Sequence, residues 1–390
     1  MAVERTEQVL RPAPGVQEPS GVVGAPEAQV EEFYVASQWQ LMWWRFRKHK
    51  MAMVSIVILA LLYLSAIFCE FVAPNDPHLF NQNFTYAPPQ RPHFFSEDGF
   101  HLRPFVYGYT KERNPETFAL DYVIDTEQKY PIYFFTRGHE YKLWGLWTTN
   151  IHLFGIQSEE MPLFLLGSDR LGRDLFSRIV YGARISLSIG LIGVFLSMVL
   201  GILIGGISGY YGGTVDLIVQ RMIELLVAIP TIPLWMGFSA ALPADWSPIK
   251  TYFGITVILS LIGWSGLARV VRGKFISLRE EDFVMAARLM NASELRIILR
   301  HLVPSFLSYL IASLTLAIPG MILGETALSF LGLGLQPPVV SWGVLLREAQ
   351  NFRSVANAPW LLLPGMAVVL SVLAFNFVGD GLRDAADPYA

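Results

Sequence analysis

Long uninterrupted apolar runs are the feature of this chain that most limits what it can fold into. The first lies at residues 51–72, MAMVSIVILALLYLSAIFCEFV, and several more follow. About 20 apolar residues in a row are enough for a helix to cross the hydrocarbon core of a bilayer, and a soluble core has no need for them. Only 16% of the residues are charged, against about 25% in soluble domains. We therefore expect an all-α membrane protein.

Six transmembrane helices are predicted from the apolar runs. They lie at about 51–72, 185–208, 217–242, 252–270, 305–331 and 360–378. Pro230 and Pro233 are expected to interrupt the third span, and Pro319 with Gly320 to interrupt the fifth, because proline removes a helical hydrogen bond. The sequence thus predicts two discontinuous spans.

Basic residues set the predicted orientation of these spans. Arg45, Arg47, Lys48 and Lys50 precede the first span, which places the N-terminus in the cytoplasm. Six spans then return the C-terminus to the same side. The stretch between the fourth and fifth spans also falls inside, and it is rich in arginine, as the positive-inside rule requires. Two independent signals therefore agree on the topology.

Four segments divide the chain. Residues 1–36 mix Pro, Gly, Glu and Gln, lack a basic start followed by an apolar stretch, and are interpreted as a disordered cytoplasmic tail rather than a signal peptide. Residues 37–73 are an amphipathic segment with the first span, and 74–166 form an extracytoplasmic insert whose runs YPIYFF and IHLFGI indicate strands or turns. Residues 167–390 hold the other five spans.

Small and charged residues give two local expectations. Gly193, Ser197 and Gly201 are spaced four apart in the second span, and small residues at that spacing let helices approach closely. Arg221 and Glu224 are three apart in the third, where they could pair on one helix face or contact solute. Pairing is the preferred interpretation.

Several kinds of chemistry are not indicated. Cys69 is the single cysteine, the seven histidines show no HExxH spacing, and no GxxxxGK[ST] phosphate-binding loop occurs. A net charge of −3 gives no sign of nucleic-acid binding. We expect no metal, no cofactor and no ATP hydrolysis by this chain. An intramembrane enzyme would need a catalytic pair inside the spans, and none is found, so the chain is predicted not to be an enzyme.

The stretch LREEDFVMAARLMNASELRIILRHLVPS, at 278–305, is predicted to be a helix–turn–helix outside the membrane. Good helix formers with an acidic start favour a first helix at 280–290. Asn291 is expected to end it, because asparagine tolerates the left-handed conformation that often follows a helix. A second helix is expected at 294–302, with Pro304 ending it.

Ala286 and Ala287 are expected to present a flat surface into which a partner could press. The alternative is a plain polar connector between two spans.

This stretch resembles the EAA loop of bacterial ABC-transporter permeases, whose pattern is Glu-Ala-Ala, three residues, Gly, nine residues, Ile-x-Leu-Pro. Ala286, Ala287 and Pro304 match. The spacing is kept while four positions differ: Met285 for Glu, Asn291 for Gly, His301 for Ile and Val303 for Leu.

Three further segments resemble the dipeptide/oligopeptide permease C subfamily. They are GSDRLGRDLFSRIVYGARISL at 167–187, GETALSFLGLGLQPPVVSWG at 324–343 and FNFVGDGLRDAADP at 375–388. Their order and specificity identify the chain as a member of the binding-protein-dependent type I importers.

The resemblance implies a type I ABC importer permease fold in a bacterial or archaeal cytoplasmic membrane, embedded in lipid. It implies a second homologous permease subunit, two ATPase subunits and an extracytoplasmic solute-binding protein that delivers di- or oligopeptides. The ATPase-coupling loop would span about 280–304, with Glu281, Ala286, Ala287, Asn291 and Pro304 as its docking residues. Alternatives are another solute, such as a nickel chelate, glutathione or an oligosaccharide, or a self-gated channel.

Glu325 is the ionisable residue in the fifth span that most suggests function. Ionisable residues within a membrane face a bundle interior or a water path. The hypothesis is that Pro319, Gly320 and Glu325 line or gate the translocation path. The equal alternative is a structural ion pair or hydrogen bond from Glu325 to a neighbouring span.

Overall fold

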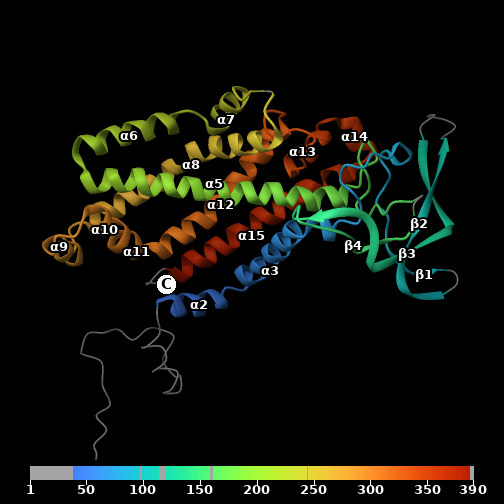
Figure 1. Ribbon diagram of the computed structural model, residues 1–390, viewed down its shortest axis with the longest axis horizontal. Coiled ribbons are helices and arrows are strands. Elements are labelled where there is room, and N and C mark those ends of the chain that lie inside the picture. The colour runs from blue at the N-terminus through green and yellow to red at the C-terminus, as the bar shows by residue number, and fades with distance from the viewer. Residues whose placement is uncertain (1–37, 97–98, 114–119, 159–160, 244, 387–390) are drawn as a thin grey trace, which may run out of the picture.

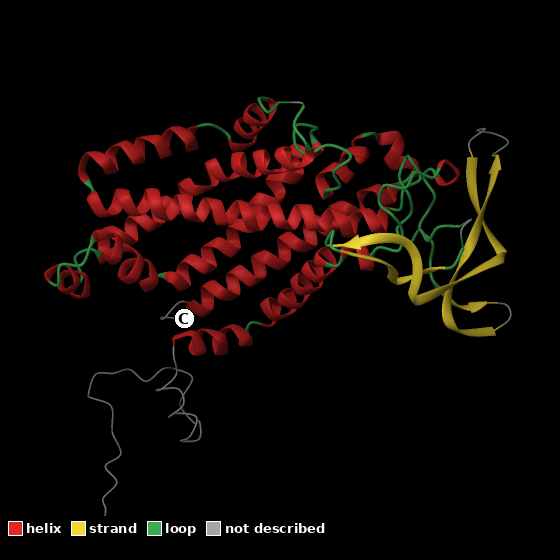
Figure 2. Cartoon of the chain, viewed as in Figure 1, coloured by secondary structure: helices red, strands yellow, loops and turns green. Residues whose placement is uncertain are grey.

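The computed structural model describes residues 38–96, 99–113, 120–158, 161–243 and 245–386. The predicted tail at 1–36 lies outside this range. Long helices run side by side and form the body of the molecule, with a β-sheet at one end and short helices at the other (Figures 1 and 2). The described part is mostly helical rather than all-α, because the segment between the first two long helices contains strands.

The first span is split near its end. Helix α2 (Gln38–Lys48) is followed by α3 (Lys50–Ile67) and a single turn, α4 (Cys69–Val72). His49 caps α3, its Nδ1 accepting the Ala52 backbone N–H at 3.1 Å. The predicted run 51–72 thus corresponds to α3 with α4.

Two helices are much longer than the spans predicted for them. Helix α5 (Leu175–Tyr211) has 37 residues and α8 (Pro248–Leu278) has 31. At 1.5 Å per residue α5 is about 55 Å long, well beyond the about 30 Å of a hydrocarbon core. Both helices therefore project from the membrane region.

The predicted close approach at the small residues of α5 is confirmed, and α8 is the partner. Ser260 Oγ donates to Gly193 O at 3.0 Å, and Ser197 Oγ donates to Ser260 O at 3.2 Å. The same stripe continues to Gly205, where a side chain would meet the α8 backbone. Small residues let the two backbones touch in the way that membrane helices commonly pack.

The third predicted span is bent. Helices α6 (Gly213–Ala228) and α7 (Thr231–Ala240) meet at Pro230 with an angle of 90°. Pro230 and Pro233 were both expected to interrupt this span. Pro230 does so directly before α7, whereas Pro233 lies inside α7 and does not break it. Arg221 and Glu224 pair as expected, with 2.6 Å between Nη1 and Oε2.

The fifth span differs from its prediction. Helix α12 (Leu307–Phe330) is continuous through Pro319, so the expected interruption at Pro319 and Gly320 is wrong. A proline inside a helix loses one hydrogen bond but does not have to break it when neighbours hold the helix in place. Pro319 is buried, and α12 packs against α5 and α15 (Leu363–Ala386).

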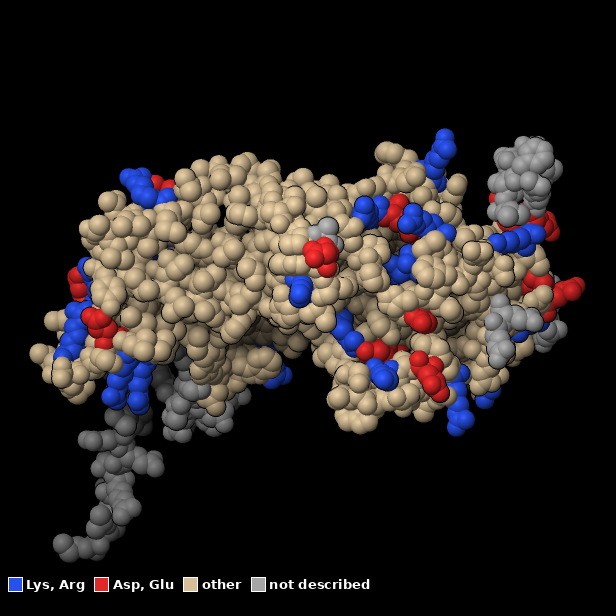
Figure 3. Space-filling view, turned by 45° about the horizontal axis from the view of Figure 1, so that its top comes forward, with Lys and Arg blue, Asp and Glu red and all other residues tan. Residues whose placement is uncertain are grey.

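Five helices are long and apolar enough to cross a membrane, or six if the bent pair α6 and α7 counts as one span, among the residues that the structure describes. Charged side chains gather toward the two ends of the molecule and leave an uncharged band across the helical body in the face shown (Figure 3). That distribution suits a protein set across a bilayer.

A core of apolar side chains joins the helices. Buried members come from α3, α5, α8, α12 and α15, among them Leu59, Leu187, Leu259, Ile322 and Phe375. Between α12 and α15 lie the short elements α13 (Trp342–Leu346), η3 (Arg347–Gln350), α14 (Phe352–Asn357) and η4 (Pro359–Leu362). Trp342 is fully buried and its indole N–H donates to Ile179 O of α5 at 3.0 Å.

Four antiparallel strands form the sheet, in the order β1-β2-β3-β4. They are β1 (His93–Ser96), β2 (Gly99–Arg113), β3 (Leu120–Leu143) and β4 (Trp147–Ile156). The run YPIYFF lies in β3 and IHLFGI in β4, so the strands or turns expected there are strands.

Candidate functional site

The predicted helix–turn–helix follows α8 and lies at the end of the molecule away from the sheet (Figure 1). Helix α9 (Asp282–Leu289) is capped by Met290, and Asn291 directly after it has a φ of 58°. Asparagine tolerates this left-handed conformation, so the expected stop is confirmed.

The second half of the coupling loop (residues 280–304) is less regular than predicted. Helix α10 (Glu294–Ile297) passes into the π-helical turn η2 (Ile298–Leu302) and then α11 (Val303–Ser305). The helical run ends at Phe306 rather than at Pro304; Pro304 directly follows the π-helical turn η2, and a proline inside a helix removes one hydrogen bond without having to end the helix.

A buried apolar cluster fixes the coupling loop to two long helices. Val284 and Ala287 of α9 and Ile297 and Leu302 of the second half belong to it. It also contains Val271, Phe275, Phe306 and Leu310. Phe275, on α8, and Phe306, at the start of α12, meet edge to face with ring centroids 6.1 Å apart. The loop is therefore packed against both α8 and α12.

The two adjacent alanines do not share a surface. Ala286 is exposed, whereas Ala287 is 1% exposed and packs in the cluster. The expected flat face made by both alanines is wrong, because consecutive residues of an α-helix point about 100° apart. The outer side of α9 carries Met285 and Leu289 instead, and Met290 follows them.

Several apolar side chains of the coupling loop are exposed, Phe283 among them. The loop surface, as it is called below, consists of Met285, Ala286, Leu289, Met290, Leu295 and Leu299. Exposed apolar side chains on one segment are typical of a surface that contacts another protein or a membrane. Of these residues, only Ala286 was predicted from the sequence to contact a partner. The available signal for the others was their recurrence about every four residues along the predicted helices.

Two charged residues of the loop contact the end of α5, and a third is exposed. The Arg288 guanidinium lies over the Tyr210 ring, 5.3 Å from its centroid, and Tyr211 donates a hydrogen bond to Glu294. Both tyrosines end α5, so this helix also reaches the loop. Glu281 is exposed at the N-terminus of α9 and makes no capping bond through its side chain.

A second charged group, missed from the sequence, joins α6 to α8 near the loop. Arg272 Nη2 donates to Asp216 Oδ2 at 2.5 Å, Arg272 Nε donates to Asp216 Oδ1, and Ser208 Oγ donates to the same Oδ1 at 2.6 Å. This two-pronged ion pair is the strong form of an arginine–carboxylate contact. The residues are 56 positions apart, so only the predicted topology, which puts both on one side of the membrane, hinted at the pairing.

Glu325 is the centre of a buried hydrogen-bond network and is fully buried in this chain. Its Oε1 accepts from Ser329 Oγ at 2.8 Å and from Ser341 Oγ at 2.7 Å, and its Oε2 accepts from Ser186 Oγ at 3.1 Å. Each of these hydroxyls in turn accepts a backbone N–H, those of Leu335, Val344 and Trp342 respectively. The network ties α12 to α5 and α13.

The three residues expected to line a path are not brought together. Pro319 and Glu325 are buried, whereas Gly320 is exposed and has open space beside it. The contacts of Glu325 are those of the structural alternative, a hydrogen-bonded link between spans. A path through Pro319, Gly320 and Glu325 stays a prediction without support from this arrangement.

Replacement of Glu325 by glutamine is expected to preserve both assembly and transport. Serine hydroxyls can donate or accept, so they can rotate to suit an amide at this position. Glu325→Ala should instead leave three buried hydroxyls without their acceptor, at about 1–3 kcal/mol for each unsatisfied group. Membrane abundance and uptake by the two variants would check this. Loss of uptake in Glu325→Gln with normal abundance would show that the charge itself is used.

Comparison with known proteins places the chain among membrane transport components. Residues 201–389 match the family described as binding-protein-dependent transport system inner membrane component, and 37–89 match the N-terminal TM domain of oligopeptide transport permease C. The oligopeptide transport system permease protein OppC of Haemophilus influenzae is 42% identical over 57% of this chain and 69% of that protein.

A second relative is the dipeptide transport system permease protein DppC of Alkalihalophilus pseudofirmus. It is 40% identical over 57% of this chain and 71% of that protein. Among solved structures, an inward-facing conformation of the MetNI methionine ABC transporter is 19% identical, with a TM-score of 0.42 over 53% of this chain and 96% of that chain.

Proposed function

This chain belongs to the family of binding-protein-dependent transport permeases, in the oligopeptide and dipeptide permease C group, and we propose that it forms the translocation pathway of a peptide importer driven by ATP. It is the membrane-spanning permease subunit of an ATP-binding-cassette importer. Its relatives are named for oligopeptides and dipeptides, which favours peptides over a nickel chelate, glutathione or an oligosaccharide.

The coupling loop is the observation that carries the proposal. It projects from the helical body, presents the loop surface, and is anchored by a buried cluster to α8 and α12. We assign docking of the ATPase subunit to Met285, Ala286, Leu289 and Met290. Ala287 does not contact the ATPase subunit; it packs in the buried cluster and holds α9 in place.

Asn291 and Pro304 set the shape of the loop. Asn291 gives the turn between α9 and α10 through its positive φ, and Pro304 lies where the loop enters α12. Glu281 begins α9 and is exposed, so it can meet a basic group of the ATPase subunit.

ATP-driven closure of the two ATPase subunits would move each docked loop as a rigid body. Because α8 and α12 are packed on the same cluster as the loop, they would transmit this motion to the membrane region. Such a displacement between two packed states changes which side of the membrane has access to the pathway. The chain itself would not hydrolyse ATP.

The proposed topology has six spans, with α6 and α7 together forming the third, and both termini in the cytoplasm. Basic residues fall beside α2 and in the coupling loop, both at the end of the molecule that would face the cytoplasm. The sheet would then face outward within the insert at 74–166, the permease core would span 167–390, and a solute-binding protein would dock on the outer side.

Reconstitution tests the proposal. The chain in proteoliposomes with a second permease, two ATPase subunits and a binding protein should take up labelled di- or oligopeptides only when ATP is supplied. The chain alone should take up no labelled peptide. Robust peptide flux through the chain alone would support the self-gated channel and contradict the subunit proposal.

A further inference from the structure

Aromatic side chains from two distant parts of the chain meet at the end of α3 nearest the sheet. Phe68 and Trp144 have ring centroids 5.4 Å apart, Phe71 and Phe135 6.1 Å, and Trp144 and Trp147 6.0 Å. Phe68 and Phe71 follow α3, whereas the other three come from β3, β4 and the turn between them. These five residues are called the aromatic rim.

The end of α3 marks a membrane boundary. Its 18 residues make a helix of about 27 Å, close to the about 30 Å of a hydrocarbon core. Helix α2, with exposed Trp43 and Trp44, adjoins its other end. Ile67, the last residue of α3, therefore lies at the opposite boundary, and the aromatic rim begins there.

The β3–β4 turn is bonded to this boundary. The Trp144 indole N–H donates to Ile67 O at 2.8 Å. Gly145, with a φ of +74°, allows the tight turn, and it directs Leu146 and Trp147 into the open. The tip, residues 143–147, thus presents exposed apolar side chains next to the end of α3, where Leu64 and Ile67 are exposed too.

Charge in this region suits lipid headgroups. The Glu70 carboxylate is held by the Arg184 guanidinium at 2.7 Å, and Arg184 also donates to Ala66 O and Ile67 O at 3.0 Å. Lys142, directly before the tip, is exposed. A lysine stem over apolar surface with its ammonium at the headgroups is the usual arrangement at an interface.

We propose that the β3–β4 tip, with the aromatic rim, inserts into the headgroup region of the leaflet next to the end of α3. The partner is the lipid bilayer itself. The tip continues the lipid-facing side of α3, and tryptophan, with an apolar ring and one N–H donor, is the side chain enriched at membrane interfaces. Membrane contact at this tip holds the sheet at a fixed height above the bilayer.

Lipid quenching tests the insertion. Leu146, 72% exposed, is replaced by cysteine and labelled with bimane in the full chain in nanodiscs; the native Cys69 is fully buried and the unmutated chain serves to measure background labelling. Lipids brominated near the headgroup end of their acyl chains should strongly reduce bimane fluorescence at position 146 relative to unbrominated lipids.

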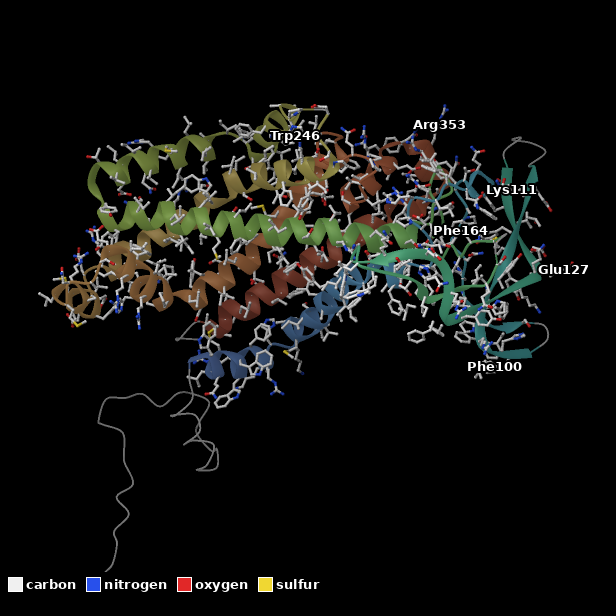
Figure 4. The ribbon with its side chains drawn as sticks, in the orientation of Figure 1. Phe100, Lys111, Glu127, Phe164, Trp246 and Arg353 are labelled. Carbon is white, nitrogen blue, oxygen red and sulfur yellow. The ribbon has the colours of Figure 1, made fainter. Side chains whose placement is uncertain are left out.

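The matched control is Phe100→Cys, 62% exposed and placed at the far end of the sheet (Figure 4). Its fluorescence should not change with bromination. Trp147→Cys gives a second probe of the tip if Leu146→Cys assembles poorly. Quenching at 146 and 147 no stronger than at 100 would overturn the proposal. Shielding of the tip from aqueous iodide only when a solute-binding protein is added would overturn it as well.

Discussion

Substitution of Leu289 by aspartate is expected to abolish ATP-driven uptake while the permease chain itself stays folded. Leu289 is 87% exposed in this chain, and exposed substitutions usually change the free energy of unfolding by no more than about 0.5 kcal/mol. In a complex the same side chain would be desolvated against the ATPase subunit. An unpaired buried charge costs about 3–5 kcal/mol. Each 1.4 kcal/mol is about tenfold in affinity, so docking should weaken by about two to three and a half orders of magnitude.

The control for this experiment is Leu102→Asp. Leu102 is also 87% exposed, but it lies on β2 in the sheet, at the other end of the molecule. Co-purification of the ATPase subunits with the tagged chain and ATP-dependent uptake of labelled peptide are the measurements. Leu289→Asp should lose both and Leu102→Asp should keep both. Normal ATPase recovery with Leu289→Asp would mean that the loop surface is not where the ATPase docks.

Local sequence patterns predicted the parts of this fold that depend on local forces. Apolar runs located the long helices, and the helix formers before Asn291 located α9 and its end to within a residue or two. The runs around Tyr130 and Ile151 were predicted to be strands or turns, and both lie in strands. Each of these depends on side chains that are near neighbours along the chain.

Tertiary packing decided the points that local patterns missed. Pro230 and Pro319 gave the same signal, yet α6 and α7 bend by 90° at the first while α12 continues through the second. Pro319 is buried in a helix packed against α5 and α15, and those neighbours hold the backbone in place. No single-sequence rule separates the two cases.

The candidate sites were predicted only as far as their residues are adjacent in sequence. The coupling loop was found, but its outer surface was assigned to both Ala286 and Ala287, which point in different directions. The partners of Glu325 extend from Ser186 to Ser341, and Asp216 pairs with Arg272. Such long-range partners are fixed by the fold and leave no local trace.

Substitution of Gly205 by leucine should destabilise the chain more than any other change considered. A Cβ at this position would lie 2.4 Å from Ala268 O and 2.8 Å from Ala268 Cα, both backbone atoms of α8 that cannot rotate away. Helices α5 and α8 would have to separate. That would strain the two hydrogen bonds that join them nearby, Ser197 to Ser260 and Ser260 to Gly193. Overpacking costs about 1–3 kcal/mol where side chains can yield, and more is expected where backbone must move.

Gly266→Leu on α8 provides the matched control, because a Cβ there meets no atom within 4 Å. The two variants add the same side chain to the same pair of helices. We expect Gly205→Leu to fall in membrane abundance and in thermal unfolding midpoint in detergent, while Gly266→Leu stays near the parent chain. Since α5 and α8 both end at the coupling loop, any Gly205→Leu protein that survives should also lose ATP-dependent uptake. Equal midpoints for the two variants would mean that α5 and α8 do not pack through their glycine face, and that the loop is anchored to the membrane region in another way.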